Sequence, residues 1–460
     1  MSIFMTSCAT QRPSLLPAVA VSDLPDLPKS LTVEDEVDEF AVKKINKKLF
    51  QTGHMEKMTL SFVAKKMLVT NPDIEIFNAR EEQAKYGIDI ARAKLWPTID
   101  VKISEGRENV YTTSGDTLNS KRQEASIAVN HTLFDFGKIG KDIEQSEKAH
   151  EAAQLRAKGK ADKILLTLAN AYLDVLETRE LSRVTNKNIL QIHKFKNLVK
   201  ANQEEGNASV ADLKKVEARL ENARAVFVDL KANYETSREN FKKITDFYPI
   251  NLQQPPKLSY YEKANFADAQ FNLMDTKIEL QAIRKDIEGL TKKLGSIGAS
   301  RLPVIRLAAL ANYKKNVGGL NDPIKDIRFD VSVKFRLFDG GAKAAQEKRV
   351  EAEIREGRAL LRKKTKGFEQ DMRNSDSDQK ASIKKNTLLA KRLKAARKVV
   401  ELNTEQFKEG VLTIFELLDA QTQLLSAHQA QIKNRFQKYR VRYKQLHLAD
   451  RLLPSLVEEN

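Results

Sequence analysis

The sequence contains few of the residues that interrupt helices or close disulfides. Its 460 residues include one cysteine, 18 glycines and 12 prolines. A single cysteine excludes an intrachain disulfide framework, and a low content of glycine and proline favours long, continuous helices. No apolar run approaches the length of roughly 20 residues that a membrane-spanning helix needs. If the chain crosses a bilayer, it therefore does so by strands.

The residue patterns of catalysis and metal binding are also missing. The six histidines are scattered without the spacing of metal ligands, and no glycine-rich phosphate loop or nucleophile motif is found. The sequence therefore predicts neither an enzyme nor a cofactor or metal site.

The chain is basic, with a formal net charge of +17 and 31% charged residues. Its lysines and arginines are interleaved with acidic residues along predicted helices, a pattern typical of solvated helix faces. A nucleic-acid binder would instead cluster aromatic side chains for base stacking. No such cluster is found, so we expect no nucleic-acid partner.

The N-terminal region predicts a leader rather than a folded domain. Residues 11–27 are rich in proline and predict an extended, poorly ordered segment. The stretch Met5-Thr6-Ser7-Cys8 loosely resembles a bacterial lipobox, in which the cysteine is acylated. The apolar segment before it is too short for a signal peptide. Either the natural start lies further upstream and Cys8 is a lipidation site, or the match is accidental.

Two motifs recur in the chain at one distance. TLFDFGK (132–138) matches RLFDGGA (336–342), and EEGNASVADL (204–213) matches KEGVLTIFEL (408–417). Both matches have an offset of 204 residues, for example between Gly206 and Gly410. A shared offset indicates a tandem duplication. We divide the chain into a leader (1–57), a first repeat (58–262), a second repeat (263–452) and a C-terminal tail (453–460).

Each repeat predicts the same order of elements: a helix, a proline, two strands, a very long helix, a glycine turn and a returning helix. The predicted helices are Met58–Leu95, Lys138–Gln203 and Val210–Phe241 in the first repeat, and Asp268–Leu294, Ala342–Phe407 and Thr413–Leu452 in the second. The predicted strands are Thr98–Ser104, Glu124–Phe134, Val304–Tyr313 and Arg328–Phe338.

The predicted helices fit together in length. The long ones reach roughly 100 Å at 1.5 Å per residue, and the two short helices of a repeat, stacked end to end, can line that flank. Apolar residues of the returning helices step by three and four, as in a coiled coil; examples are Leu213, Val216, Leu220 and Ala223, and Ile432, Phe436, Tyr439 and Tyr443. The helices alone are compatible with a non-transporting coiled-coil scaffold of the periplasm or cell surface.

The strands favour a membrane protein instead. In Arg328–Phe338, apolar and polar residues alternate, as in a barrel strand with lipid on one side and water on the other. Four strands cannot close a barrel, and open strand edges are not tolerated in lipid. Because the smallest membrane barrels have about eight strands, the sequence demands a dimer or a trimer.

The pattern resembles the TolC-type outer membrane efflux proteins of Gram-negative bacteria over roughly Met58 to Leu452. The similarity rests on both LFDxG strand ends, the duplication, both glycine turns and, above all, EGVLTIFELLDAQTQLLSA (409–427). It implies a mainly α fold in which a homotrimer forms a tunnel of twelve helices and a twelve-stranded outer-membrane β-barrel. It also implies a passive exit duct that serves efflux or type I secretion, docked to an inner-membrane pump by a periplasmic adaptor.

The resemblance also implies a gate at the periplasmic tips, which are the turns at Gly206 and Gly410. Glu416 and Asp419 occupy positions where the family forms acidic rings, and being three apart they share a helix face. The alternative is that these acids only complement the helix dipole. Family members tie the tip closed with an aromatic residue, an arginine and an acidic partner; the matching positions are Phe407, Leu412 and Asp212. Leu412 departs from that pattern, so the tie is incomplete.

Overall fold

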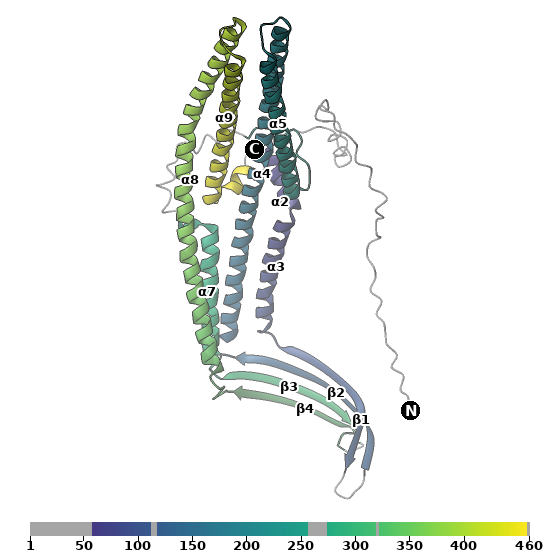
Figure 1. Cartoon of the computed structure of the whole chain (residues 1–460). Helices are drawn as coiled ribbons and strands as arrows, with labels where there is room; N and C mark the ends of the chain where they lie inside the picture. Colours follow the sequence, from purple (N-terminus) through teal and green to yellow (C-terminus); the bar gives the residue numbers. More distant parts are fainter. Residues whose placement is uncertain (1–57, 112–116, 256–273, 319–321, 458–460) are drawn as a thin grey trace, which may run out of the picture. The chain divides into compact units, whose positions relative to one another are not determined.

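One antiparallel sheet of four strands, in the order β1-β2-β3-β4, occupies one end of the residues that the structure describes (Figure 1). The structure is a computed structural model that describes residues 58–111, 117–255, 274–318 and 322–457. Cys8, the leader and the repeat boundary at residues 262 and 263 lie outside these ranges. The strands are β1 (Thr98–Tyr111), β2 (Thr117–Phe134), β3 (Val304–Lys315) and β4 (Ile324–Lys334).

All four predicted strands are confirmed, with corrected limits. β1 and β2 are longer than predicted, because their polar outer halves pair with each other through to Tyr111 opposite Thr117. β4 was predicted four residues too late. Pro303 precedes β3, whose first residue Val304 pairs with Lys334, so the apolar residues after Lys334 have no partner strand and do not continue β4.

The helices follow the predicted order. Their bounds are α2 (Leu60–Thr70), α3 (Pro72–Ala93), α4 (Lys138–Glu204), α5 (Val210–Thr245), α7 (Ile278–Ala299), α8 (Ala342–Lys408), α9 (Ile414–Leu448) and α10 (Leu452–Val457). The long helices α4 and α8 have 67 residues each. Their starts, Lys138 and Ala342, keep the offset of the sequence repeat.

Two predicted helix limits were wrong, and a third lies outside the described residues. The first helix is divided at Asn71, whose side chain caps α3, and Pro72 occupies the first position of that helix, where a missing N–H costs nothing. The predicted start of the second pre-strand helix, Asp268, lies outside the described residues, in which α7 begins at Ile278. α9 ends at Leu448, and the short helix α10 follows within the residues that we assigned partly to the tail.

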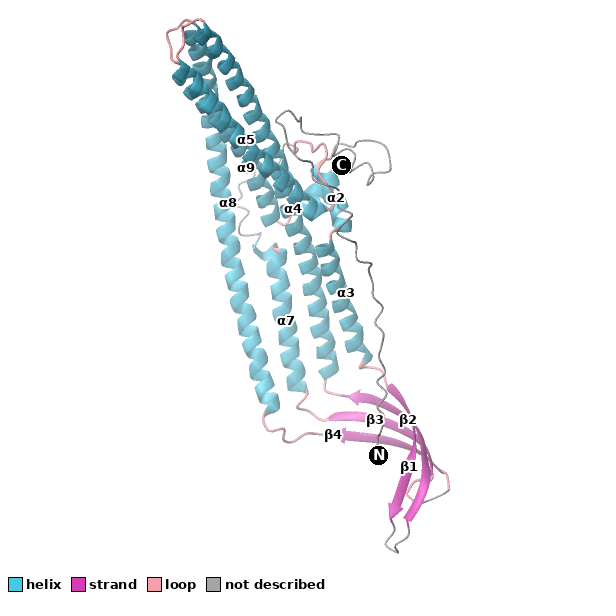
Figure 2. Ribbon diagram, turned by 45° about the vertical axis from the view of Figure 1, so that its right-hand side comes forward, coloured by secondary structure: helices cyan, strands magenta, loops and turns pink. Residues whose placement is uncertain are grey.

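The helices form a layer in which α4 lies inside and α8 lies at a margin. Both views show α3, α4, α7 and α8 side by side in that order next to the sheet (Figure 2). α4 contacts α3 and α5 on one flank and α7 and α9 on the other, whereas α8 contacts only α7 and α9 among the described elements. α3 and α8 are therefore the two free edges of this half of the layer.

The short helices stack end to end along the long ones, as the sequence predicts. The Asn71 side chain donates a hydrogen bond to the carbonyl of Ile244 near the end of α5, at 3.1 Å. In the second repeat, Asp450 after α9 accepts from the backbone N–H of Ile278 at the start of α7, at 2.8 Å. Asp450 also forms a buried ion pair with Lys277. We call the contact of Lys277, Ile278 and Asp450 the α7–α9 joint.

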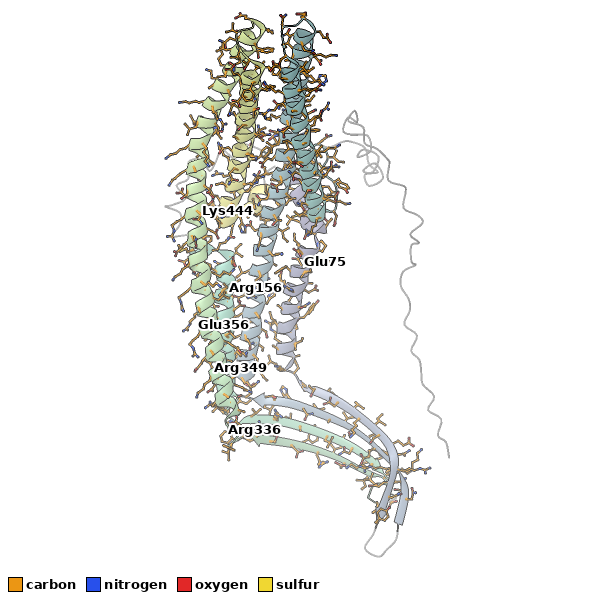
Figure 3. The ribbon with its side chains drawn as sticks, in the orientation of Figure 1. Glu75, Arg156, Arg336, Arg349, Glu356 and Lys444 are labelled. Carbon is orange, nitrogen blue, oxygen red and sulfur yellow. The ribbon has the colours of Figure 1, made fainter. Side chains whose placement is uncertain are left out.

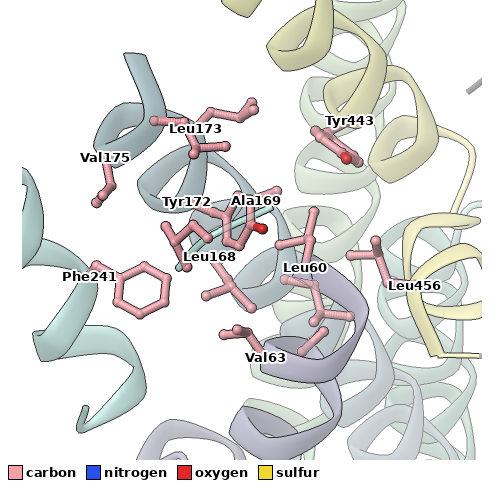
Figure 4. Close-up of a cluster of buried hydrophobic side chains, with 14 of the residues drawn as sticks. Leu60, Val63, Leu168, Ala169, Tyr172, Leu173, Val175, Phe241, Tyr443 and Leu456 are labelled. Atoms are coloured by element: carbon pink, nitrogen blue, oxygen red, sulfur yellow. The ribbon is translucent and has the colours of Figure 1, made fainter. Parts of the chain in front are cut away.

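The largest hydrophobic core lies where α2, α4, α5, α9 and α10 meet. Figure 4 shows Leu60, Leu168, Tyr172 and Phe241 around its centre. The Tyr172 hydroxyl contacts the carbonyl oxygens of Met58 and Gln253, at 2.8 and 2.7 Å. Burial of this phenol raises its pKa, so it remains a neutral hydrogen-bond donor.

Candidate functional site: the helical tips and the two-faced sheet

The two tip turns have the same backbone structure. Gly206 and Gly410 take positive φ angles of 83° and 75°, a conformation that glycine adopts without steric cost. After α4, Gly206 N–H bonds to Gln203 O and Asn207 N–H to Asn202 O. After α8, the N–H groups of residues 410 and 411 bond to residues 407 and 406 in the same way. Both are Schellman motifs, and they fix where each hairpin turns.

Each returning helix begins with a capping box. In α9, Thr413 Oγ1 donates to the Glu416 carboxylate at 2.8 Å, and the Thr413 backbone N–H donates to it at 3.1 Å. In α5, Ser209 and Asp212 make the same arrangement, and Lys215 adds a bond to Asp212 at 3.1 Å. The bond from Ser209 and then that from Lys215 lower the pKa of Asp212, and the bonds from Thr413 lower the pKa of Glu416. Both carboxyls are therefore charged at neutral pH.

Asp419 differs from these two acids. It is exposed and lines an open groove of about 450 Å³ between α8 and α9, together with Leu412, Glu416 and Phe415. The structure thus brings Glu416, Asp419 and Leu412 together. Asp212 lies on the other hairpin, and Phe407 is absent from the groove lining because its ring packs into the tip cluster described next.

A hydrophobic tip cluster holds α9 against the first hairpin. It joins residues of α4 and α5 to the start of α9, with members Ile192, Phe195, Val199, Val216, Leu220, Ala223, Ile414, Leu417 and Leu418. Buried Gln421 donates to Asn188 at 3.0 Å, and Arg219 bonds to Thr422. Sequence reasoning missed these polar contacts. Gln421 follows Leu417 by four residues in the buried seam, and a polar residue at such a position was the available signal.

Further along, acidic residues of α4 pair with arginines of α9. Arg440 contacts Asp174 and Glu177, both at 2.5 Å, and Arg435 pairs with Glu180. These ion pairs between α4 and α9 were not predicted from the sequence. These ion pairs hold α9 on α4 alongside the main core, whose α9 members include Ile432, Phe436 and Tyr443.

The sheet has one apolar and one polar face. Cross-strand rows such as Ile99, Val129, Ala309 and Phe329 run over all four strands on one side. On the other side, the row of Lys102, Ser126, Asn312 and Asp326 is polar on all four strands. Phe329 is 77% exposed and Ile99 is 67% exposed, so the apolar face is covered by nothing within the described residues.

No described helix is both long and apolar enough to cross a membrane, and the described residues contain no cluster of side chains suited to hold a metal ion. The structure therefore offers the tips and the sheet as its candidate functional features.

Residues 63–245 and 274–446 match the family described as "Outer membrane efflux protein". These ranges cover most of the chain. The chain belongs to the outer membrane efflux protein family. The protein is therefore an outer membrane efflux channel of a Gram-negative bacterium, and this membership decides against the coiled-coil scaffold alternative. Members of the family are passive channels rather than enzymes.

Individual relatives of this efflux protein agree with that assignment. Outer membrane protein TolC of Salmonella enteritidis is 20% identical over 372 residues, 78% of this chain and 75% of the relative. The probable efflux pump outer membrane protein TtgC of Pseudomonas putida is 20% identical over 393 residues, 80% and 78% of the two chains. The solved outer-membrane channel OprN has a TM-score of 0.77 at 18% identity, covering 93% of this chain and 98% of that chain. The predicted fold, long helical hairpins continued by four barrel strands per protomer, is confirmed.

Proposed function

We propose that this outer membrane efflux protein is the exit duct of a tripartite efflux or type I secretion system. A homotrimer would span the outer membrane and extend into the periplasm, where an adaptor protein would connect it to an inner-membrane pump. The pump would supply the energy, because the duct itself only conducts. The observation that carries this proposal is that the sheet and the helical layer both end in free edges.

Each edge strand of the sheet is adjacent in the sequence to an edge helix of the helical layer. β1 follows α3, and β4 leads towards α8, so an unpaired strand edge and an unpaired helix edge belong together on each side. Unpaired backbone groups of β1 and β4 are not tolerated in lipid. Copies joined edge to edge around an axis satisfy both layers at once. Three copies supply the twelve strands of the barrel that the resemblance implies.

The assembly is tested by the mass of the purified protein in detergent. We expect a trimer whose subunits separate on heating, with strands protected from protease in outer-membrane vesicles. A monodisperse, folded monomer that needs no detergent would contradict the architecture.

We further propose that Glu416 and Asp419 form acidic rings at the periplasmic mouth. Their place beside the second tip turn and in one groove supports the proposal. In a trimer the two positions supply six carboxylates, which attract cations and can hold them in the pore. The equivalents in the first repeat are Asp212 and Lys215, which pair with each other. The first hairpin therefore has no unpaired acid at these two positions.

The ring is tested by single-channel conductance in planar bilayers, with divalent cations added on the periplasmic side. Glu416→Gln and Asp419→Asn remove charge but keep an acceptor oxygen, so the α9 cap survives in the first variant. We expect weaker cation block and reduced cation selectivity in the double variant. Lys214 and Lys215 on the first hairpin are the control positions, where substitution by Gln should change block less. Equal block in wild type and double variant would remove the ring.

Efflux and type I secretion remain alternatives for the pump that this duct serves. A neighbouring gene for a proton-driven exporter would favour efflux. A neighbouring gene for an ABC transporter, together with a large repeat-rich protein, would favour secretion.

A further inference from the structure

The free face of α3 carries evenly spaced acids. Its buried seam, which includes Ile74 and Ala91, packs on α4. On another face, exposed residues follow one another at intervals of four, three, four and three: Glu75, Ala79, Glu82, Tyr86 and Asp89. These are heptad intervals, and every second position is a carboxylate.

The free face of α8 carries evenly spaced bases. Its buried seam near the sheet includes Val350 and Ile354. Opposite that seam, exposed residues follow at intervals of three, four, three, four and three: Ala345, Lys348, Ala352, Arg355, Ala359 and Arg362. Every second position is a lysine or arginine, and each of the others is an alanine.

Both faces lie at margins of the helical layer. Figure 3 shows Glu75 on α3 and Arg349 on α8 at opposite sides of it. None of the three acids or three bases forms an ion pair with another described residue, although most charges in the neighbouring helices do. A row of unpaired acids and a row of unpaired bases with the same period are complementary surfaces on one chain.

The chain contains an internal template for their contact. The second repeat's short helix α7 runs antiparallel on the first repeat's long helix α4. There, Glu144 pairs with Lys292 at 2.7 Å, and one heptad further Glu151 pairs with Lys285 at 2.9 Å. This inter-repeat contact shows how a long helix of one repeat receives the short helix of the next.

The duplication relates this template to the free faces, with an offset of 204 residues between the long helices and of 206 between the ends of the short helices. Glu144 and Glu151 correspond to Lys348 and Arg355 of α8. The last residues of α7 and α3, Ala299 and Ala93, align the two short helices, so that Lys292 corresponds to Tyr86 and Lys285 to Ala79. At this register Glu82 lies opposite Ala352, between the two bases. The small alanine leaves room for the carboxylate to reach either one.

We propose that the acidic face of α3 in one copy packs antiparallel against the basic face of α8 in a second copy, as an interlocking charge ladder. The proposal rests on the homotrimer proposed above and names its helical contact. The polarity is opposite to that of the template, in which the long helix is acidic and the short helix basic. If α3 of a second copy instead took the place of α7 on α4, its acids would oppose Glu144 and Glu151. This repulsion between like charges disfavours that arrangement. The α4–α7 ion pairs within a copy and the proposed α3–α8 charge ladder between copies together fix the order of helices around the ring.

The register is tested by disulfide formation between copies. Cys8 is the only native cysteine, so Cys8→Ser provides a clean background. In that background, Glu82→Cys with Ala352→Cys should give covalent dimers and trimers under mild oxidation, resolved on denaturing gels. The matched control is Glu82→Cys with Ala359→Cys, which is displaced by one heptad, or about 10 Å along the helix. We expect at least about tenfold less product from the control, since disulfides need Cα atoms within about 7 Å.

Charge reversal tests the electrostatics independently. The triple variant Glu75→Lys/Glu82→Lys/Asp89→Lys should abolish the trimer at low salt. The triple variant Lys348→Glu/Arg355→Glu/Arg362→Glu should do the same. The combined variant should restore it, because the ladder is then reversed but complete. If both cysteine pairs react equally, or if each reversal leaves a stable, conducting trimer, the ladder is wrong and the proposed duct stands. A wild-type chain that stays monomeric overturns both proposals.

Discussion

The α7–α9 joint predicts an unusually large effect for a single charge removal. Lys277 and Asp450 are 2.5 Å apart, and only 7% and 12% of their side-chain surfaces are exposed. The Lys277 ammonium also donates to the carbonyl of His447 at 2.9 Å. Asp450→Asn removes the only carboxylate paired with this ammonium among the described residues. Breaking a buried pair in this way costs about 3–5 kcal/mol, because the remaining charge stays buried.

The same helix offers a matched control. Glu279, two residues after Lys277, pairs with Lys364 at 2.7 Å, but the two side chains are 57% and 48% exposed. Surface pairs of this kind contribute about 0–1 kcal/mol. Glu279→Gln should therefore have little effect at a nearly identical place in the fold. The comparison separates the effect of burial from that of charge.

Hydrogen exchange measured by mass spectrometry is the assay, because it reports local opening rather than loss of the whole trimer. In Asp450→Asn, amides in the first turn of α7 and the last turns of α9 should exchange on the order of 10² to 4 × 10³ times faster, at 1.4 kcal/mol per factor of ten. Lys277→Met added to Asp450→Asn should restore most of the protection, since a flexible apolar side chain can pack beside Phe368. Unchanged exchange in the single variant, or no recovery in the double variant, would refute the reasoning.

Two further predictions concern the tips. Gly410→Ala places a side chain at φ 75° and should destabilise the second tip by about 1–2 kcal/mol, measured as faster amide exchange around residue 410 with α4 unchanged. The lowered pKa of Asp212 means that its cap is stabilising above the unfolded-state pKa of about 3.9 and is lost as pH falls through the lower folded value. We expect the first tip to loosen below about pH 4 in wild type, and Asp212→Asn to flatten that pH dependence.

The places of α4 and α8 within the helical layer explain a difference in their composition. The sequence alone gave no cause for this difference. NAYLDVLETRELS (170–182) in α4 has six apolar residues, whereas its counterpart NSDSDQKASIKKN (374–386) in α8 has two. α4 is enclosed by helices on both flanks, and Leu173 and Leu176 are fully buried. α8 packs only on α7 and α9 among the described elements, so most of its surface is left uncovered by them. The position of a helix within the layer, inside or at an edge, is a tertiary property that periodicity does not reveal.

The helices and strands were predictable where one seam or one face decides the pattern, and the element ends were not. The heptads of α5 and α9 are buried as predicted, for example at Leu220 and Phe436. The break at Asn71 had a sequence signal, because a proline within a helical pattern ends the helix before it. The extensions of β1 and β2 had none, since their polar residues do not alternate. Only pairing between strands holds them.

The gate acids show how far site prediction from sequence reaches. The spacing Thr413-x-x-Glu416 is a capping box, so the sequence already contained a local role for Glu416, and the structure shows its carboxylate engaged by Thr413. The sequence pattern gives Asp419 no capping role. Its side chain is exposed in the groove, and its position corresponds to Lys215 in the first repeat. A carboxylate held by a cap is less available to a cation than a free one. We therefore expect Asp419→Asn alone to weaken cation block more than Glu416→Gln alone, and equal single effects would show that the cap does not restrain Glu416 in the pore.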